Sequence, residues 1–466
     1  MFFHQFYLGC LAHASYFLGD EKTGTAVVVD PQRDIDQYVA LAEEKGMRIE
    51  HVFLTHFHAD FLAGHLELRD RFGAKLYIGQ NGETEYDAVA VKDGDRFEWG
   101  NFAIEVRETP GHTPESVCLV IYDDVAEGAP PYGVLTGDTL FIGDVGRPDL
   151  FGSVGYTTEQ LAGNLYDSLH QKVMTLPDAT KVYPAHGAGS MCGKNLSTDT
   201  VSTIGAQRLS NYALKAPTKE KFIEQVTADQ PEAPAYFAID AQLNKKERPI
   251  LETELARSVV PYSLDEFQRR AAGAQVLDVR EAEEFAAGHL AGSVNIGLEG
   301  RFATWCGTLL EKEIPILVVA PKGREREAIM RLGRIGFDSA IGYLENADEV
   351  LASTKTVKFG RVDVRELAAS RDQVTVIDIR QPGEFETSHI EGSILMPLAH
   401  VRARFAEVPR DRKVALICRT GYRSTIAISL LEQEGFTNLV DLRGGIVAWG
   451  EAGQPVTGAA PSCSTG

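Results

Sequence analysis

Two histidines and an aspartate lie close together in residues 55–65, which read Thr-His-Phe-His-Ala-Asp-Phe-Leu-Ala-Gly-His. His56 and His58 are two residues apart, and Asp60 follows after two more. Neutral imidazole combined with carboxylate suits zinc or iron better than magnesium. The apolar run 52–54 directly precedes these residues and predicts a short buried strand. The pattern therefore predicts a metal site where a strand ends and a loop begins.

Three more polar residues follow predicted strands in the first half of the chain. They are His112 in Thr-Pro-Gly-His-Thr-Pro, Asp138 in Leu-Thr-Gly-Asp-Thr, and His186 in Tyr-Pro-Ala-His-Gly. We expect a strand or hairpin within residues 1–20, helices over about 34–45 and after Phe61, and strands at 26–30, up to 54, 75–78, 102–107, 117–122 and 133–135. This mixture predicts layers of sheet covered by helices.

These four separated motifs, in this order, resemble the metallo-β-lactamase superfamily over essentially the whole first half. The resemblance implies a four-layer αββα sandwich with the metal at one edge of its paired sheets. Two-metal hydrolases of this superfamily have a histidine directly after the motif aspartate, where this chain has Phe61. A phenyl ring cannot bind a metal, which weighs against a second ion. The segments Gly-Asp-Thr-Leu-Phe-Ile-Gly-Asp-Val-Gly-Arg-Pro-Asp and Ala-His-Gly-Ala-Gly-Ser resemble the persulfide dioxygenase branch.

Membership of that branch implies one Fe(2+) per chain, held by His56, His112 and Asp138. Three ligands on one face of the ion leave neighbouring positions open for a persulfide and for O2. The resemblance gives roles in orienting ligands or moving protons to His58, Asp60 and His186. For His58 the alternative is a ligand role, as in the zinc enzymes of this fold. His65 is expected to be a buried helix residue.

The Gly-Arg-Pro-Asp segment resembles the substrate-binding loop of the same branch through Arg147 and Asp149. Arg147 would hold a carboxylate of a carrier thiol such as glutathione, and a surface salt bridge is the alternative. Cys192 in Ser-Met-Cys-Gly-Lys is expected to be a buried, unreactive thiol, with sulfur exchange as the alternative.

The second half contains two copies of one module. The run from Val276, Val-Leu-Asp-Val-Arg-Glu, returns from Val376 as Val-Ile-Asp-Ile-Arg-Gln, and His289 returns at the same displacement as His389. Each copy alternates strands with helices, which predicts two doubly wound α/β domains. We expect domains at 1–253, 254–355 and 356–456, followed by a flexible tail, 457–466, that contains Cys463.

The second copy carries a candidate nucleophile. A predicted strand over 414–417 runs into Cys418-Arg-Thr-Gly-Tyr-Arg-Ser, and a helix is expected to begin near Ser424. A cysteine in such a loop lies among backbone N–H groups near a helix N-terminus, which stabilises thiolate and bound anion. The module resembles a rhodanese, which carries sulfane sulfur as a cysteine persulfide. Arg419 and Arg423 would attract sulfite or thiosulfate.

A cysteine phosphatase is the nearest alternative for this loop. Phosphatases place an arginine six positions after the cysteine, whereas Arg423 comes five after Cys418. The first copy has Ala320 in the place of the nucleophile and cannot carry sulfur in this way. A structural or docking role is expected for it, in dimerisation or in covering the metal pocket. Cys306 is expected to serve packing.

The composition and charge of the chain limit the kinds of partner that it is expected to bind. The chain has 466 residues and a net charge of −20, which argues against nucleic acid as the main partner. No run approaches the roughly 18 apolar residues of a membrane helix, and no basic segment precedes the first hydrophobic residues. We expect a cytoplasmic homo-oligomer without a membrane partner. The six scattered cysteines favour free thiols.

The order of the three modules matches fusion proteins of a persulfide dioxygenase and rhodaneses. We therefore expect oxidation of a small-thiol persulfide by O2 to sulfite, with sulfane-sulfur transfer between persulfide and sulfite or thiosulfate through Cys418. The first alternative is a zinc-dependent thioester hydrolase of the glyoxalase II kind with an accessory rhodanese. The second is a rhodanese pair that docks partners or senses sulfur without catalysis.

Overall fold

The computed structural model describes residues 1–150 and 155–458, and the chain forms two compact units. The first unit contains residues 1–254 and 333–337, and the second contains residues 255–332 and the chain from Asp338 onward. Cys463 and most of the expected flexible tail, from residue 459 onward, lie outside the described residues. No helix among the described residues is long and apolar enough to cross a membrane.

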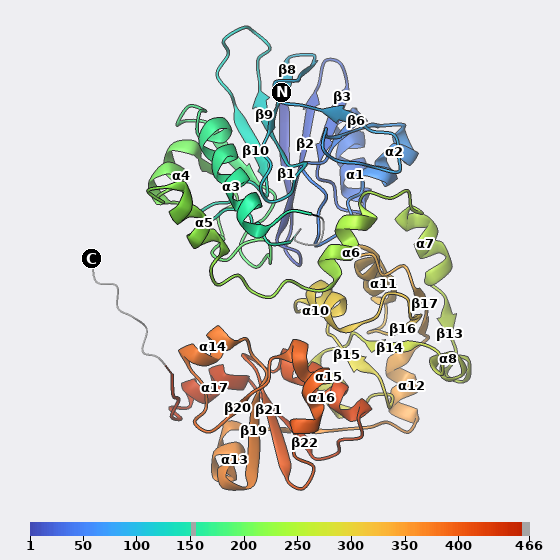
Figure 1. Cartoon of the computed structure of the whole chain (residues 1–466). Coiled ribbons are helices and arrows are strands. Elements are labelled where there is room, and N and C mark those ends of the chain that lie inside the picture. Colours follow the sequence, from blue (N-terminus) through green and yellow to red (C-terminus); the bar gives the residue numbers. More distant parts are fainter. Residues whose placement is uncertain (151–154, 459–466) are drawn as a thin grey trace. The chain divides into compact units, whose positions relative to one another are not determined.

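Two six-stranded sheets form the middle of the first unit (Figure 1). The first sheet follows chain order: β1 (Phe2–Leu8), β2 (His13–Asp20), β3 (Thr25–Val29), β4 (Arg48–Phe53), β5 (Lys75–Gly79) and β6 (Val89–Val91). The second runs from β12 (Ser202–Thr203) through β11 (Lys181–Pro184), β10 (Gly133–Gly137), β9 (Val117–Tyr122) and β8 (Phe102–Glu108) to β7 (Arg96–Trp99). Strands β1 and β2 form the expected amino-terminal hairpin.

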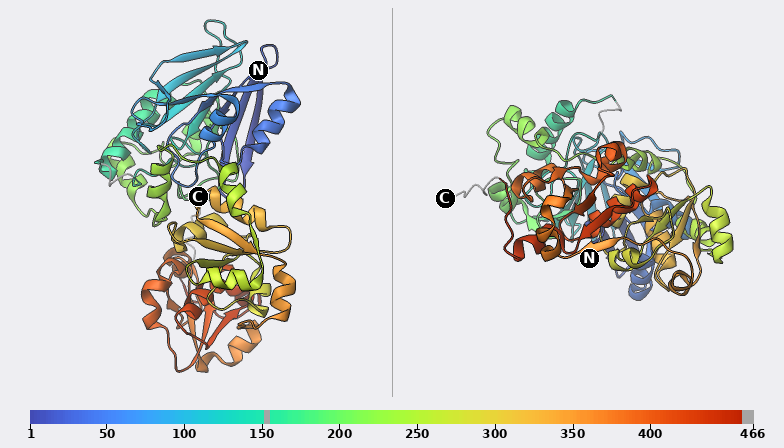
Figure 2. Two further views of the ribbon diagram at one scale, coloured as in Figure 1. Left: turned by 90° about the vertical axis from the view of Figure 1, so that its right-hand side faces the viewer. Right: turned by 90° about the horizontal axis from the view of Figure 1, so that it is seen from below.

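Helices cover the outer faces of both sheets (Figures 1 and 2). One side carries α1 (Asp36–Lys45) and α2 (His65–Phe72), and the other carries α3 (Thr158–Ser168), a π-helical turn η2 (Leu169–Val173), α4 (Ile204–Ser210) and α5 (Lys219–Thr227). Helices α6 (Tyr236–Leu243) and α7 (Leu251–Ser258) follow. The predicted αββα order is confirmed, and the predicted elements lie within two or three residues of the observed ones.

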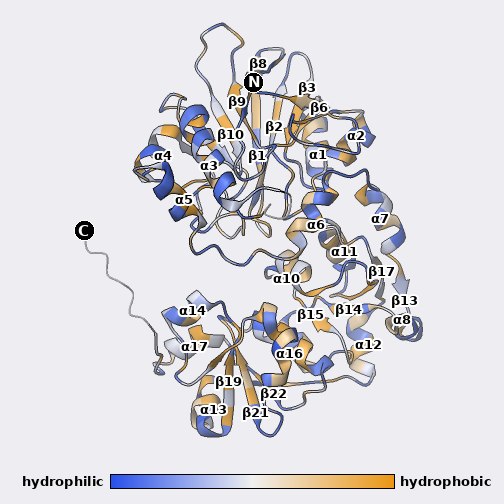
Figure 3. Cartoon of the chain, in the orientation of Figure 1, coloured by the Kyte–Doolittle hydropathy of each residue, from blue (hydrophilic) through white to orange (hydrophobic). Residues whose placement is uncertain are grey.

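Alternation along the strands explains this layering, because successive side chains point to opposite faces of a sheet. On β4, Phe53 packs between the sheets with Leu119 and Leu135, whereas Val52 packs toward the helices with Leu66. Figure 3 shows the same division, with mostly hydrophobic strands and hydrophilic segments on α2, α3 and α4. The polar residues of the candidate site stand where these buried strands end.

The second unit contains two five-stranded sheets, each entirely parallel. The first has the order β13 (Pro261–Tyr262), β17 (Ala340–Leu344), β16 (Ile316–Val319), β14 (Gln275–Asp278), β15 (Val294–Asn295). The second has the order β18 (Gly360–Val362), β22 (Leu439–Leu442), β21 (Lys413–Ile417), β19 (Val374–Asp378), β20 (Ile394–Leu395). The two orders are the same, so the predicted duplication is confirmed.

Helices alternate with these strands. The first copy has α8 (Leu264–Ala271), α9 (Ala282–Ala287), α10 (Phe302–Leu309), α11 (Glu325–Gly333) and α12 (Ala347–Ser353). The second has α13 (Val364–Ala369), α14 (Pro382–Thr387), α15 (Val401–Arg404), α16 (Tyr422–Gln433) and α17 (Gly445–Glu451), with short 3-10 turns η3 (Arg371–Gln373), η4 (Leu398–His400) and η5 (Phe405–Glu407). Helix α16 begins two residues before the predicted start, directly after Gly421, which has a φ of +108°.

The repeated Asp-x-Arg motif has a structural role in both copies. Arg280 pairs with Asp278 and Arg380 pairs with Asp378, each through an Nη2 to Oδ2 contact of 2.6 Å. All four side chains are buried. A buried ion pair with this bidentate geometry fixes the turn after the strand, so the motif marks the repeated fold and not a reaction centre.

Candidate functional site

Three predicted ligands come together at one edge of the first unit. His56 follows β4, His112 lies between β8 and β9, and Asp138 directly follows β10. Each offers a ligand atom within 4.8 Å of the other two. Oδ2 of Asp138 lies 3.8 Å from Nε2 of His56 and 3.4 Å from Nε2 of His112. Ends of strands from both sheets therefore bring together residues that are far apart in the sequence.

The donor atoms at this site fit a metal ion. Nε2 of His112 and both carboxylate oxygens of Asp138 are buried and have no hydrogen-bond partner among the described residues. An unpaired buried polar group costs about 1–3 kcal/mol, so several converging on one point indicate a bound ligand. Burial, followed by His58 and His112, holds the pKa of His56 well below its ordinary value. The imidazole is therefore neutral, the form that binds zinc or iron(II).

Neighbouring groups aim the ring nitrogens at this point. Nδ1 of His112 donates to the carbonyl of Arg147 at 2.9 Å, which leaves Nε2 for a metal. Nδ1 of His56 lies 3.0 Å from the hydroxyl of Thr55, and Asp30 accepts from that hydroxyl at 2.8 Å and from the Thr55 N–H at 2.7 Å. Such partners fix the tautomer and the direction of a ligand. Sequence reasoning missed Asp30, although it ends the predicted strand 26–30 beside the ligand-bearing strand.

Replacing Asp30 with asparagine is expected to weaken metal binding about 10–100-fold. The amide NH2 cannot accept from Thr55, so the alignment of His56 is lost. Competition with a chromogenic chelator measures the affinity. Asp36→Asn, at an exposed position of α1, is the matched control, and equal affinities for both variants would refute the role of Asp30.

The glycine before Arg147 allows the loop to approach the site. A Cβ on Gly146 would lie 1.9 Å from the carbonyl oxygen of Asp138 and 3.1 Å from Cβ of His112. No side chain fits there without moving a candidate ligand. The Gly-Arg-Pro-Asp segment therefore shapes the site through its backbone.

A second donor set lies beside the first. His58, Asp60 and His186 also have ligand atoms within 4.8 Å of one another. Nε2 of His186 lies 3.6 Å from Asp60 and 3.7 Å from Asp138, while Nε2 of His58 lies 3.1 Å from Asp30. Burial alone would lower the pKa of His58, but Asp30 raises it on balance. His58 is therefore held by a carboxylate outside the three-ligand set.

An apolar wall stands beside the second donor set, directly after Asp60. The Phe61 ring is fully buried, 4.2 Å from the His13 ring and 4.4 Å from the His58 ring, measured between centroids. His13, the first residue of β2, is a buried neighbour of the site that sequence reasoning missed. Burial, followed by His186 and His58, holds its pKa well below the ordinary value. His65 is buried at the start of α2, as expected.

Arg147 is buried and fully engaged. Its Nε and Nη2 donate to the two oxygens of Asp149, both at 2.7 Å, and the guanidinium also donates to the carbonyls of Met191 and Pro231. Burial alone would raise the pKa of Asp149, but Arg147 lowers it on balance. The pair therefore clamps the loop with a buried arginine and a partly exposed carboxylate, whereas the alternative considered from the sequence was a surface salt bridge.

Cys192 lies at the same site. Its sulfur is within 4.8 Å of ligand atoms of Asp138 and His186, and the residue is 1% exposed. Burial, followed by the carboxylates of Asp60 and Asp138, raises the pKa of the thiol well above its ordinary value. A buried, protonated thiol is a weak nucleophile, which agrees with the expected unreactive role.

The second unit holds the candidate nucleophile. Cys418 directly follows β21 and is 1% exposed. The backbone N–H of Gly421 donates to its sulfur at 3.1 Å, and the hydroxyl of Ser424 lies 3.5 Å from it. The Gly421 N–H directed at the sulfur stabilises the thiolate, the reactive form. The loop 418–424 therefore has the geometry expected for a sulfur carrier.

The two arginines of this loop differ in their surroundings. Arg423 is locked by a bidentate ion pair with Glu384 of α14, at 2.7 Å for both contacts. Arg419 is exposed. Of the two predicted anion-binding residues, Arg419 thus has the accessible charge, and Arg423 carries a carboxylate partner that the sequence did not indicate.

The first copy has the same loop without a nucleophile. Ala320 follows β16 and is buried, and Arg324 of this loop forms ion pairs with Glu327 and Glu299. Cys306 is buried on α10, where burial raises its pKa well above the ordinary value. Its expected packing role is confirmed.

Known protein families match both the first and the second half of the chain. The metallo-beta-lactamase superfamily matches residues 8–186, and the rhodanese-like domain matches residues 263–347 and 362–452. Mitochondrial persulfide dioxygenase ETHE1 of Bos taurus is 32% identical over 233 residues, 49% of this chain and 82% of the relative. Hydroxyacylglutathione hydrolase of Rhizobium etli is 34% identical over 174 residues, 36% of this chain and 59% of the relative.

A crystal structure of a metallo-beta-lactamase from Staphylococcus aureus shares the fold. It is 32% identical, with a TM-score of 0.66, and the match covers 74% of this chain and 98% of that one. The chain therefore belongs to the persulfide dioxygenase family of the metallo-beta-lactamase superfamily, and two rhodanese-like domains follow its dioxygenase-like region.

Proposed function

We propose that the first unit oxidises the persulfide of a small thiol, such as glutathione persulfide, with O2. One persulfide, one O2 and one water give sulfite, the thiol and two protons. The observation that carries the proposal is the set of His56, His112 and Asp138, whose ligand atoms lie within 4.8 Å of one another in a chain of this family; Nε2 of His112 and both oxygens of Asp138 are buried and unpaired among the described residues. Two imidazoles and one carboxylate are the ligand set of non-haem iron oxygenases.

His56, His112 and Asp138 would hold a single iron(II), which would supply the chemistry that lets O2 react with the persulfide. The surrounding residues orient the candidate ligands. Asp30 and the carbonyl of Arg147 direct His56 and His112 toward the ion, and Phe61 keeps the neighbouring space apolar. Asp60 and His186, which lie 3.6 Å apart, are placed to move protons as water adds and thiol leaves.

We further propose that Cys418 carries sulfane sulfur. Its thiolate takes the terminal sulfur from a persulfide, which leaves as the thiol, and sulfite then removes that sulfur as thiosulfate. The reverse sequence would regenerate a persulfide from thiosulfate. Arg419 at the loop surface supports binding of these anions, and the Gly421 N–H supports the sulfur charge. The two activities together would detoxify sulfide.

Oxygen uptake tests the first activity. Wild-type protein loaded anaerobically with iron(II) is expected to consume O2 when glutathione persulfide is added and to release sulfite or, through Cys418, thiosulfate. Oxygen-independent loss of S-lactoylglutathione, with no O2 uptake, would contradict the proposal.

The zinc-dependent thioester hydrolase remains the second candidate because of one observation. His58, Asp60 and His186 form a donor set beside the first, and a hydrolase of this fold would use such residues for metal. The pairing of His58 with Asp30 and the apolar wall of Phe61 favour the dioxygenase.

We also propose module boundaries at 253, 355 and 456 and a homo-oligomeric state. A cytoplasmic location is likewise proposed, whereas the matched mammalian relatives are named mitochondrial.

A further inference from the structure

One face of helix α16 contacts the cysteine-less copy. The Tyr422 hydroxyl donates to the carbonyl of Gly297 at 2.8 Å. The Ser429 hydroxyl accepts from the N–H of Asn295 at 3.1 Å, and the Gln433 amide donates to the carbonyl of Gly292 at 2.8 Å. Tyr422, Ser429 and Gln433 are spaced seven and four residues apart, which places them on one side of a helix. The helix that follows the nucleophile loop is therefore docked along its length.

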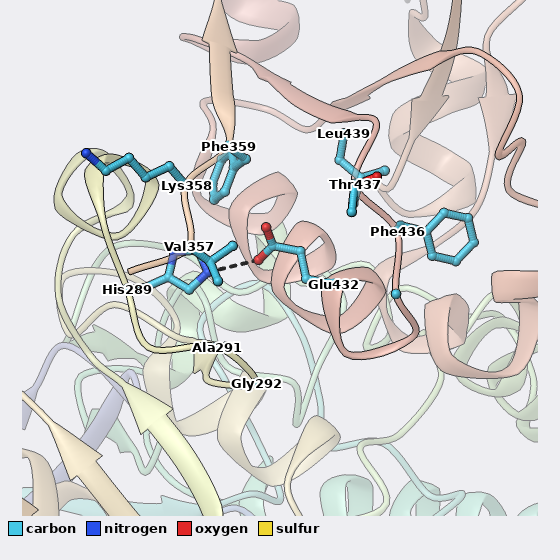
Figure 4. A pocket seen from close by; sticks show the side chains of 11 residues that line it. His289, Ala291, Gly292, Val357, Lys358, Phe359, Glu432, Phe436, Thr437 and Leu439 are labelled. Atoms are coloured by element: carbon cyan, nitrogen blue, oxygen red, sulfur yellow. Dashed lines mark hydrogen bonds and ion pairs between the residues drawn. The ribbon is translucent and has the colours of Figure 1, made fainter. Parts of the chain in front are cut away.

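A short contact between an imidazole and a carboxylate adds to these hydrogen bonds. Figure 4 shows the ring of His289, from the first copy, directed at the carboxylate of Glu432 on α16, and Nε2 and Oε2 are 3.0 Å apart. Nδ1 of the same ring lies 2.8 Å from the carbonyl of Phe285. His289 is 1% exposed. The end of this contact that lies in the first copy is therefore buried.

Tyr422 links the contact between α16 and the first copy to the loop 418–424. This residue directly follows Gly421, whose N–H donates to the sulfur of Cys418 at 3.1 Å. A Cβ on Gly300 would lie 2.2 Å from the Tyr422 ring, so the ring rests directly on the backbone of the first copy. Because Tyr422 is held at both its ring and its hydroxyl, the peptide before it is held as well.

A second series of contacts leads from the first copy to the sulfur of Cys418. Glu283 of the first copy lies 2.7 Å from Nη1 of Arg361, and Arg361 donates to Asp441 at 2.7 Å. Asp441 in turn accepts from the hydroxyl of Ser424, which lies 3.5 Å from the sulfur of Cys418. Ser424 and Asp441 are fully buried. Burial raises the pKa of Asp441, and Arg361 opposes that rise, so the position of Arg361 matters to the charge of this carboxyl.

We propose that the cysteine-less copy is a positioning module for the sulfur-carrying loop. Its Gly297 and Glu283 hold Tyr422 and Arg361, and these keep the Gly421 N–H directed at Cys418 and the Ser424–Asp441 pair beside it. The inference rests on the proposed sulfurtransferase function. It gives the copy with Ala320 a role that needs no nucleophile of its own.

Removing the Tyr422 hydroxyl tests this role in the full chain. Tyr422→Phe is expected to lower kcat of thiosulfate:cyanide sulfurtransfer about 3–10-fold, the effect of one lost hydrogen bond, with little change in KM for thiosulfate because Arg419 is untouched. Glu283→Gln is expected to lower kcat about 2-fold, since Glu283 is 60% exposed. Alkylation of Cys418 by iodoacetamide, followed by mass spectrometry of its peptide, should slow by similar factors.

Tyr262→Phe is the matched control, because the Tyr262 hydroxyl donates to the carbonyl of Ile341 within the first copy at 3.0 Å. It should leave both kcat and the alkylation rate unchanged. Wild-type rates in both test variants, or an equal loss in Tyr262→Phe, would overturn the proposal. If the wild type transfers no sulfur, the proposed function fails, and the alkylation rates still decide the positioning role. Glu283→Gln changes a surface carboxylate, so it provides the test if Tyr422→Phe does not fold.

Discussion

His112→Ala is expected to abolish iron binding and O2 uptake together. The substitution removes one of the three proposed ligands, and Asp138 and His56 alone would leave a bound ion open to water and to dissociation. Loss of a single outer partner of a ligand costs 10–100-fold, so loss of the ligand itself should reduce O2 uptake by more than about 100-fold. Elemental analysis and an oxygen electrode measure the two effects on one preparation.

Sulfurtransferase activity should survive in this variant, because Cys418 belongs to the other unit. His4→Ala, at an exposed position of β1, is the matched control and should retain iron and O2 uptake. Iron near the wild-type level in His112→Ala, with O2 uptake unchanged, would remove His112 from the ligand set.

Cys418→Ser is expected to show the opposite pattern. A serine hydroxyl at neutral pH is a far weaker nucleophile than a thiolate and cannot carry sulfane sulfur as a persulfide. Thiosulfate:cyanide sulfurtransfer should fall by more than about 1,000-fold, as expected when a nucleophile is removed. O2 uptake with added glutathione persulfide should remain within about 2-fold of wild type, since none of the candidate iron ligands is altered.

The control is Cys10→Ser, at a partly exposed position of the first unit. It should retain sulfurtransfer, which would show that the loss is specific to the loop cysteine. Sulfurtransfer that persists in Cys418→Ser would place the carrier at another cysteine, whereas a wild type without any sulfurtransfer would favour a docking or sensing role for the two copies.

The sequence predicted the parts of the site that depend on local spacing. The run from His56 to Asp60 and the motifs around His112 and Asp138 fall at strand ends, so their meeting at one edge followed from the fold that the family resemblance implied. The repeat at Val276 and Val376 predicted two parallel sheets, and the strand orders agree. These features are encoded within short segments, which is why one sequence is enough to find them.

Other features depend on contacts between distant segments. Nothing near Arg423 indicated that Glu384 would lock it, and nothing near Cys418 indicated that Tyr422 would rest on Gly300 of the other copy. Asp30 was likewise visible only as the end of a strand until its contacts with Thr55 placed it behind His56. Such pairings are set by tertiary packing, which spacing along one chain does not specify.

The most direct test of the proposed dioxygenase is the stoichiometry of the iron-loaded Cys418→Ser variant acting on glutathione persulfide. Iron content, O2 consumed and sulfite formed would be measured on the same sample, since the substitution prevents conversion of sulfite to thiosulfate. A single iron per chain and equal amounts of O2 and sulfite are expected. Two zinc ions per chain, no O2 uptake and hydrolysis of S-lactoylglutathione would contradict the proposal.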